Sequence, residues 1–237
     1  MATVDRAAPG VARAGRIDLL VNNAGVGLIG AAEESSLEQA KSIFDVNLFG
    51  AIRMTKAVLP LMRQQRFGRI INISSVLGLI PAPFSALYAS TKYAIEGYSE
   101  SLDHEVRGSG IRVVLVEPAY TRTGFDTNAL VADQKNDHYA PARANAEAVF
   151  RAVMTTADSP DVVADAVVTA ATTTTPRLRY TAGSMARKVV CLDASSQPRH
   201  LTRACASSCR CRRRPAFFRA VASRATAAKR LDCNHNE

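Results

Sequence analysis

The stretch from Arg69 to Lys92 constrains the fold more than any other part of this sequence. It begins with a β-branched run, Ile-Ile-Asn-Ile, which is typical of a strand covered on both faces. Ser74 and Ser75 end the run, and a helical pattern begins after Pro83. A short apolar strand, a polar turn and a helix in this order predict one unit of a parallel α/β sheet.

The helix of this unit carries Tyr88 and Lys92, four residues apart. That spacing places a phenol and an ammonium on the same helix face. A phenol has an unperturbed pKa of about 10, and a nearby cation lowers it toward a range useful for proton transfer. The pair taken alone is equally explained by an ordinary helix with one exposed tyrosine and one solvated lysine.

The remaining periodicity predicts further alternation of strands and helices. Strands are expected over residues 17–21, 69–74, 111–116 and 177–181, and helices over 36–65, from about 84 to 108, and 159–171. Residues 120–156 are mixed in character and are expected to form a segment that covers a substrate. Alternating strands and helices favour right-handed crossovers and a doubly wound parallel sheet.

Three further motifs accompany the Tyr-Lys pair. Ser75 lies thirteen residues before Tyr88, Asn47 lies in the segment Val-Asn-Leu-Phe-Gly, and Asn-Asn-Ala-Gly begins at Asn22, directly after the first predicted strand. In this order and spacing the motifs resemble the classical branch of the short-chain dehydrogenase/reductase family. The resemblance covers roughly residues 16–183 and implies a Rossmann-like parallel sheet, here a partial one.

The resemblance implies a role for each of four residues. Tyr88 would exchange a proton with a substrate oxygen while a hydride moves between NAD or NADP and a ketone or secondary alcohol. Lys92 would lower the pKa of Tyr88 and hydrogen-bond the nicotinamide ribose. Ser75 would hold the substrate oxygen and share its developing charge. Asn47 would help to hold a water behind Lys92.

Two loops are expected to contact the cofactor. The first follows the strand at 17–21, and its small residues let the backbone approach a ligand closely; it comprises Asn23, Ala24 and Gly25. The second resembles the nicotinamide loop of the family and comprises Pro118, Ala119, Thr121 and Thr123. It carries Ala119 where glycine is usual. Thr121 and Thr123 are candidates for carboxamide or phosphate contacts, or else ordinary turn threonines that bind nothing.

The sequence lacks one motif of the family, the Thr-Gly-x-x-x-Gly-x-Gly loop that cradles a pyrophosphate at a helix N-terminus. Residues 1–190 are therefore expected to form a truncated domain that binds NAD(P) weakly and is poorly soluble alone. The residue that chooses between NAD and NADP would be missing too. A catalytically inactive chain that keeps the site but cannot hold the cofactor is the alternative function.

The far end of the chain differs in composition. The sequence holds 30 Lys and Arg against 21 Asp and Glu, and residues 191–237 contribute ten of the basic residues, three of the acidic ones and all five cysteines. We expect this tail to be irregular and hypothesise that it is read out of frame. A basic, cysteine-rich interaction protein is a second alternative, but the tail has few aromatic residues for stacking, and nucleic acid is not the favoured partner.

Other features carry less information. The histidines form no ligand cluster, and no metal site is expected. The residues Glu96, Glu100, Asp103 and Glu105 are expected to form a solvated helix face, and Phe125, Tyr139 and Phe150 to line either a substrate pocket or the core. No apolar run of eighteen residues occurs, so we expect a cytoplasmic protein with no membrane partner. The resemblance also implies self-association through the helices that carry Asn47 and Tyr88.

Overall fold

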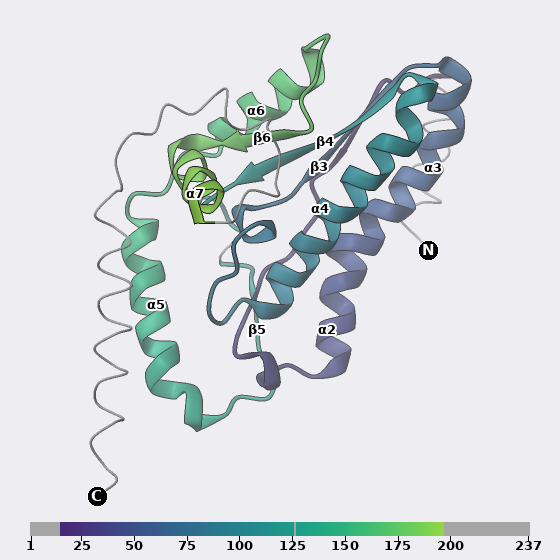
Figure 1. The fold of residues 1–237 in the computed structure, drawn as a ribbon. Coiled ribbons are helices and arrows are strands. Elements are labelled where there is room, and N and C mark those ends of the chain that lie inside the picture. The colour runs from purple at the N-terminus through teal and green to yellow at the C-terminus, as the bar shows by residue number, and fades with distance from the viewer. Residues whose placement is uncertain (1–14, 126, 197–237) are drawn as a thin grey trace, which may run out of the picture. The chain divides into compact units, whose positions relative to one another are not determined.

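The computed structural model describes residues 15–125 and 127–196 and shows a parallel α/β fold (Figure 1). Its main sheet has the strand order β1-β3-β4-β6, with every neighbouring pair parallel. These strands are β1 (Leu19–Asn22), β3 (Gly68–Ile73), β4 (Ile111–Pro118) and β6 (Arg179–Ala182). The predicted α/β class, the parallel sheet and the four expected strands are confirmed, with boundaries that shift by one or two residues.

Helices cover both faces of this sheet, and the pleat decides which strand residues meet which helix. On one face Ile70 and Val113 pack with residues of α3 (Gly50–Gln65) and α4 (Ala86–Val106). On the other face Ile71 and Val114 pack with α6 (Asp161–Thr172). These four strand side chains are fully enclosed, and each contributes roughly 1.5–3 kcal/mol of hydrophobic stabilisation on the usual transfer scale.

The predicted helix over 36–65 is present, but it is not uniform. Ser36 caps α2 (Leu37–Phe44) by accepting a hydrogen bond from the backbone N–H of Gln39. A π-helical turn, Asp45–Phe49, then joins α2 to α3. The sequence pattern did not predict this turn, because one extra residue in a helical turn changes the apolar spacing very little.

Two short strands and a helix were also not predicted. The segment 120–156 contains a short strand β5 (Leu130–Val131), which pairs in parallel with β2 (Leu28–Ile29), and the helix α5 (Ala140–Met154). No residue of α5 is buried, so this helix packs less closely on the fold than α3, α4 and α6, which do have buried residues. None of the described helices combines the length and apolar character needed to cross a bilayer.

The helix α7 (Gly183–Ser196) crosses the expected boundary between residues 190 and 191. The structure is helical for six residues past that boundary, and the division of the chain there stays a prediction. The predictions for the tail beyond Ser196 lie outside the described residues.

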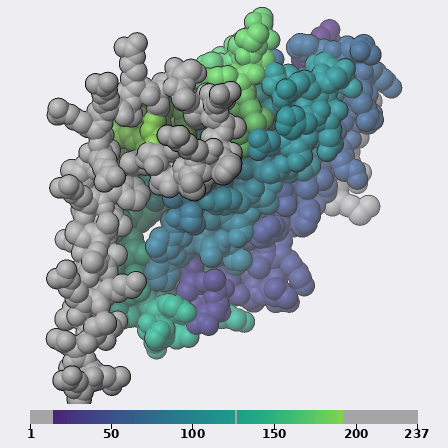
Figure 2. Space-filling view, viewed as in Figure 1, coloured from purple at the N-terminus to yellow at the C-terminus, as the bar shows by residue number. Residues whose placement is uncertain are grey.

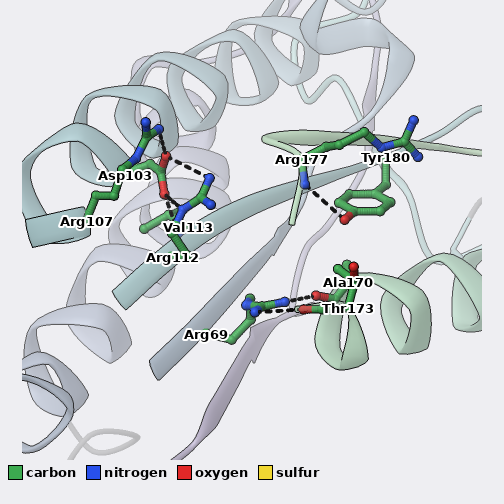
Figure 3. Close-up of polar contacts among 9 residues, drawn as sticks. All are labelled: Arg69, Asp103, Arg107, Arg112, Val113, Ala170, Thr173, Arg177 and Tyr180. Carbon is green, nitrogen blue, oxygen red and sulfur yellow. Dashed lines mark hydrogen bonds and ion pairs between the residues drawn. The ribbon is translucent and has the colours of Figure 1, made fainter. Parts of the chain in front are cut away.

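A buried carboxylate joins α4 to β4 (Figure 3). Asp103 accepts hydrogen bonds from the guanidinium groups of Arg107 and Arg112, and its Oδ1 also accepts from the backbone N–H of Val113 at 2.9 Å. Its side chain is 1% exposed. The expected solvated acidic face is therefore wrong at this position, because partners from the following strand enclose the carboxylate.

The turn after α4 requires a glycine. Gly110 has a φ of +77°, and a Cβ atom there would lie 2.1 Å from the backbone oxygen of Arg66. The predicted end of this helix near residues 108–110 is confirmed. Near the same end of the sheet, Arg69, which pairs with Arg112, donates hydrogen bonds to the carbonyl oxygens of Ala170 and Thr173 and so closes the C-terminal end of α6 (Figure 3).

Candidate active site

The predicted site residues gather where the parallel strands β1, β3 and β4 end. In sheets of this type the carboxyl ends of the strands share one edge, where ligands bind. Ser75 follows β3, the turn Asn23–Gly25 follows β1, and the loop after Pro118 follows β4. Helices α3 and α4 run past this edge beside the sheet, and their atoms form a continuous surface in the space-filling view (Figures 1 and 2).

Lys92 lies at the centre of this group. Its ammonium donates a hydrogen bond to the carbonyl oxygen of Ile73 at 2.9 Å and lies 5.6 Å from the ring centroid of Tyr88. The residue is 6% exposed. Burial lowers the pKa of Lys92 to about 8, and the negative charge of Glu96 opposes part of that shift. The predicted placement of a phenol and a cation on one helix face is present in the structure.

Asn47 connects the turn after β1 to helix α4. Its Oδ1 accepts from the backbone N–H of Val26 at 2.8 Å, and its Nδ2 donates to the carbonyl of Val26 at 2.9 Å and to Oγ1 of Thr91 at 3.1 Å. The Thr91 hydroxyl in turn donates to the carbonyl of Tyr88. Asn47 lies in the π-helical turn, a geometry often found at functional sites. Its amide thus fixes the relative positions of two site segments.

Gly25 lies against both of these residues. A Cβ atom at Gly25 would be 3.4 Å from Oδ1 of Asn47 and 3.9 Å from Nζ of Lys92. The turn therefore passes directly over the lysine ammonium with little space between them. Asn23 and Ala24, the other two predicted cofactor contacts in this turn, are exposed.

Ser75 is the N-cap of a 3-10 turn, Val76–Gly78. Its Oγ accepts a hydrogen bond from the backbone N–H of Leu77 at 3.1 Å, which leaves the hydroxyl proton of Ser75 for another acceptor. The residue is half-buried. The ring of Tyr88 packs at 5.8 Å against that of Phe125, one of the aromatic residues considered for a substrate pocket.

The predicted nicotinamide loop continues from β4. The hydroxyl of Thr121 donates to the carbonyl of Ala119 at 3.2 Å, and that of Thr123 accepts from the backbone N–H of Phe125 at 3.2 Å. Both threonines therefore shape the turn. Their expected contacts with a cofactor stay a prediction.

The sequence did not reveal how the covering segment is held. Glu34 is fully enclosed and accepts hydrogen bonds from the backbone N–H groups of Ala31 and Asn136 and from the guanidinium of Arg143. Asp133 accepts in addition from the backbone and hydroxyl of Ser36. Apart from Ala31, these partners lie about a hundred residues apart in the sequence, so no local pattern predicts the contacts.

A shallow pocket in the described part of the chain lies away from these residues. It is on the outer surface of α2 and the π-helical turn, and its lining includes Phe44, Asp45 and Phe49. None of the predicted site residues lines it. The residues at the strand ends, and not those of this pocket, are therefore the candidates for a catalytic site.

The grouped side chains are suited to proton transfer. A phenol lies beside an enclosed cation, and a serine hydroxyl stands at the end of the neighbouring strand. A cation near a phenol favours the phenolate, which makes the phenol a better acid at neutral pH. This arrangement can donate a proton to, or accept one from, an oxygen atom of a bound molecule.

Comparisons with known proteins identify related oxidoreductases. The family model described as short chain dehydrogenase matches residues 2–134. An uncharacterized oxidoreductase of Schizosaccharomyces pombe is 38% identical over 172 residues, which are 71% of this chain and 71% of that protein.

Solved structures agree as well. A short-chain dehydrogenase from Streptomyces avermitilis has a TM-score of 0.72 and 34% identity, covering 81% of this chain and 70% of that chain. The closed form of serine dehydrogenase, complexed with NADP+, has a TM-score of 0.59 and 27% identity, covering 79% and 69%. The fold, the family match and the extended similarity lead to one conclusion: this chain belongs to the short-chain dehydrogenase family of oxidoreductases.

Proposed function

We propose that this chain forms the site of an NAD(P)-dependent oxidoreductase that interconverts a ketone and a secondary alcohol, with Tyr88 as the acid and base. The observation that carries the proposal is the enclosed Lys92 ammonium, 5.6 Å from the Tyr88 ring. Among the described residues no carboxylate forms an ion pair with Lys92, so its burial is costly. Its position beside a phenol suggests that the ammonium is kept there for proton transfer.

The residues at the strand ends suit a nicotinamide dinucleotide. Ile73 is the acceptor that the described residues give to Lys92, so up to two of its three N–H groups are available for ligand oxygens. A side chain at Gly25 would begin 3.9 Å from that ammonium and would cover it further. A related solved structure is complexed with NADP+. When bound, the cofactor would supply or accept the hydride.

The proposed cofactor contacts are those expected from the sequence. Lys92 and Tyr88 would meet the nicotinamide half, together with the loop after β4. The full proposed set is Asn23, Ala24, Gly25, Tyr88, Lys92, Pro118, Ala119, Thr121 and Thr123.

Each of the four catalytic residues then has a defined task. Tyr88 holds the transferable proton on its hydroxyl and releases it to the substrate oxygen during reduction. Lys92 stabilises the phenolate that remains; with a pKa of about 8, roughly nine in ten molecules carry the ammonium at pH 7. Ser75 donates its free hydroxyl proton to the same substrate oxygen. Asn47 holds the turn at Val26 in place against α4.

Two measurements test this function. Calorimetric titration with NADPH and NADH measures cofactor binding, and the nicotinamide absorbance measures turnover on a panel of ketones and secondary alcohols. Tyr88→Phe should reduce kcat at least a hundredfold while leaving cofactor affinity largely unchanged, because the ring stays and only the proton is lost. Lys92→Ala should impair both quantities. Tyr93→Phe, on the same helix and 44% exposed, is the matched control.

The outcomes separate the alternatives. A Tyr88→Phe chain that keeps most of its kcat would remove Tyr88 from the proposed role. A folded wild-type chain that binds neither cofactor at millimolar concentration would instead support the catalytically inactive alternative. The interaction protein suggested by the basic tail concerns residues outside the described part and is a separate hypothesis.

Self-association through the helices that carry Asn47 and Tyr88 also stays a prediction. Leu37 and Phe49 support it, because their side chains are 68% and 48% exposed on the outer surface of α2 and the π-helical turn. Size-exclusion chromatography with light scattering tests it, and Phe49→Lys should shift a dimer toward monomer. The expected cytoplasmic location and the small-molecule carbonyl or alcohol partner are likewise proposals.

A further inference from the structure

Two enclosed carboxyl groups share one arginine next to the Tyr88–Lys92 pair. Glu96 follows Lys92 by one helical turn on α4, and Glu117 lies near the end of β4. Nε of Arg179, on β6, is 3.0 Å from Oε2 of Glu96 and 3.3 Å from Oε1 of Glu117. The two glutamates are 5% and 1% exposed. The expectation that Glu96 belongs to a solvated face is therefore wrong.

The pair is incompletely satisfied by hydrogen bonds. Oε1 of Glu96 and Oε1 of Glu117 are enclosed and have no hydrogen-bond partner among the described residues. Oγ of Ser74 faces Glu96 and lowers the pKa of that carboxyl, which opposes part of the effect of burial. Two enclosed carboxylates that share one ion-paired cation are expensive to keep ionised together. Retention of a proton by one of them removes most of that cost.

The surrounding charges do not compensate the pair. Glu100 contacts the same guanidinium at 3.2 Å, but its side chain is 40% exposed. The packed helix α7 contributes Arg187 and Lys188, which are both exposed. Lys92 is the other enclosed cation near the pair; the charge of Glu96 acts on it, and its ammonium lies 5.6 Å from the ring centroid of Tyr88. Arg179 is the cation that forms ion pairs with both carboxyls among the described residues.

The titration of these groups is mutually dependent. Burial, followed by the charge of Glu96, raises the pKa of Glu117 to about 8. Burial also raises the pKa of Glu96. Because the two carboxyls interact, the proton belongs to the pair rather than to either residue. The charge of Glu96 raises the pKa of Lys92, so the pair and the lysine influence each other.

We propose that Glu96 and Glu117 share one proton at neutral pH and act as a positioning pair that controls the charge of Lys92. Loss of the shared proton adds one negative charge beside the lysine and strengthens its ammonium form. By reciprocity, a charged Lys92 favours loss of that proton. The consequence for Tyr88 rests on the proposed function, whereas the shared proton itself does not.

The shared proton is tested by the pH dependence of folding. A carboxyl whose pKa is higher in the folded chain than in the unfolded chain contributes stability at low pH that is lost as pH rises toward the folded value. For Glu117 that window runs from about 4.5 to about 8. Urea unfolding measures the folding equilibrium constant of the wild-type chain. Between pH 5 and 8 this pair should make that constant fall by up to about tenfold per pH unit.

Three glutamine variants isolate this contribution. Glu117→Gln should flatten the fall relative to wild type, because the amide imitates the protonated carboxyl. Glu96→Gln should reduce the fall, and Glu100→Gln should keep it, although Glu100 contacts the same arginine. A Glu117→Gln chain with the wild-type slope would overturn the proposal, and so would a Glu100→Gln chain that flattens equally.

A spectroscopic measurement covers the case in which a variant does not fold. The infrared spectrum of the folded wild-type chain at pH 7 should show the carbonyl band of a protonated carboxyl, and the band should disappear as pH rises through about 8. The absence of this band at pH 7 would overturn the proposal without any variant.

The effect on Lys92 is tested by the pH profile of kcat. Glu96→Gln should move the alkaline limb to lower pH by about one unit, because the lysine loses an anionic neighbour. Glu117→Gln keeps Glu96 as the anionic neighbour but removes the charge that the pair gains when it loses its proton, so its limb should move in the same direction by less, with KM for substrate unchanged in both. An unmoved limb in Glu96→Gln would refute the control of Lys92, and an unmoved limb in Glu117→Gln would refute the part of the shared proton in that control. A wild-type chain without turnover would refute the proposed function, while the folding titration would still decide the shared proton.

Discussion

Replacement of Asp103 by asparagine is expected to lower the free energy of unfolding by about 2–3 kcal/mol. The carboxylate is 1% exposed and accepts from Arg112 at 2.9 Å and from the backbone N–H of Val113 at 2.9 Å. The side-chain oxygen of an asparagine can still accept hydrogen bonds as Oδ1 does, but its NH2 group would replace Oδ2 and face arginine donors that it cannot accept from. The loss is that of a hydrogen bond to a charged group, about 1.5–3 kcal/mol. The 52% exposed Arg107 adds only about 0.3–0.5 kcal/mol.

Alanine at the same position should cost more, about 3–5 kcal/mol, because the buried N–H of Val113 then has no acceptor. Urea unfolding at pH 7 measures both variants. Glu105→Gln is the matched control, since Glu105 is exposed on the same helix and should change stability by less than about 0.5 kcal/mol. A loss at Asp103→Asn no larger than at Glu105→Gln would refute the reasoning.

The pH dependence of this effect has a definite sign. Burial by itself raises the pKa of Asp103, but hydrogen bonds from Arg112 and Arg107 and from the N–H of Val113 lower it overall. A carboxyl with a depressed folded pKa contributes stability above its unfolded pKa of about 3.9 and loses it as pH falls further. The difference between wild type and Asp103→Asn should therefore shrink below about pH 4. A constant difference down to pH 2 would contradict this assignment.

Three further substitutions test the covering segment and helix α4. Gly30→Ala should destabilise the chain by about 1–3 kcal/mol, because the new Cβ would lie 2.3 Å from that of Ala132. Gly97→Ala should instead stabilise α4 by about 0.5–1 kcal/mol, because its new Cβ meets nothing within 4 Å. Thermal unfolding compares the two, and equal signs would count against the close approach of β2 and β5. Glu34→Gln should loosen the covering segment and speed tryptic cleavage at Lys135 several-fold without unfolding the sheet; an unchanged cleavage rate would argue against Glu34 as its anchor.

Local sequence patterns were sufficient for the sheet and for the central chemical pair. The β-branched run before Ser74 predicted β3 because strand burial on both faces leaves an unbroken apolar segment. The four-residue spacing of Tyr88 and Lys92 predicted their shared face because helical geometry alone fixes that direction. These features depend on residues close to one another in the sequence, and they can therefore be recognised from a single sequence.

Tertiary structure decided everything that depends on distant partners. The sequence interpretation placed Glu96 and Asp103 in water, whereas Arg179, 83 residues from Glu96, and the strand after α4 enclose them. Asn47 was recognised by its motif, but only the fold shows that its amide binds Val26 and Thr91. The local sequence around a charged residue is the same whether solvent or a buried partner surrounds its side chain. The free energy that decides between an exposed and a buried position comes from contacts made only when the chain is folded.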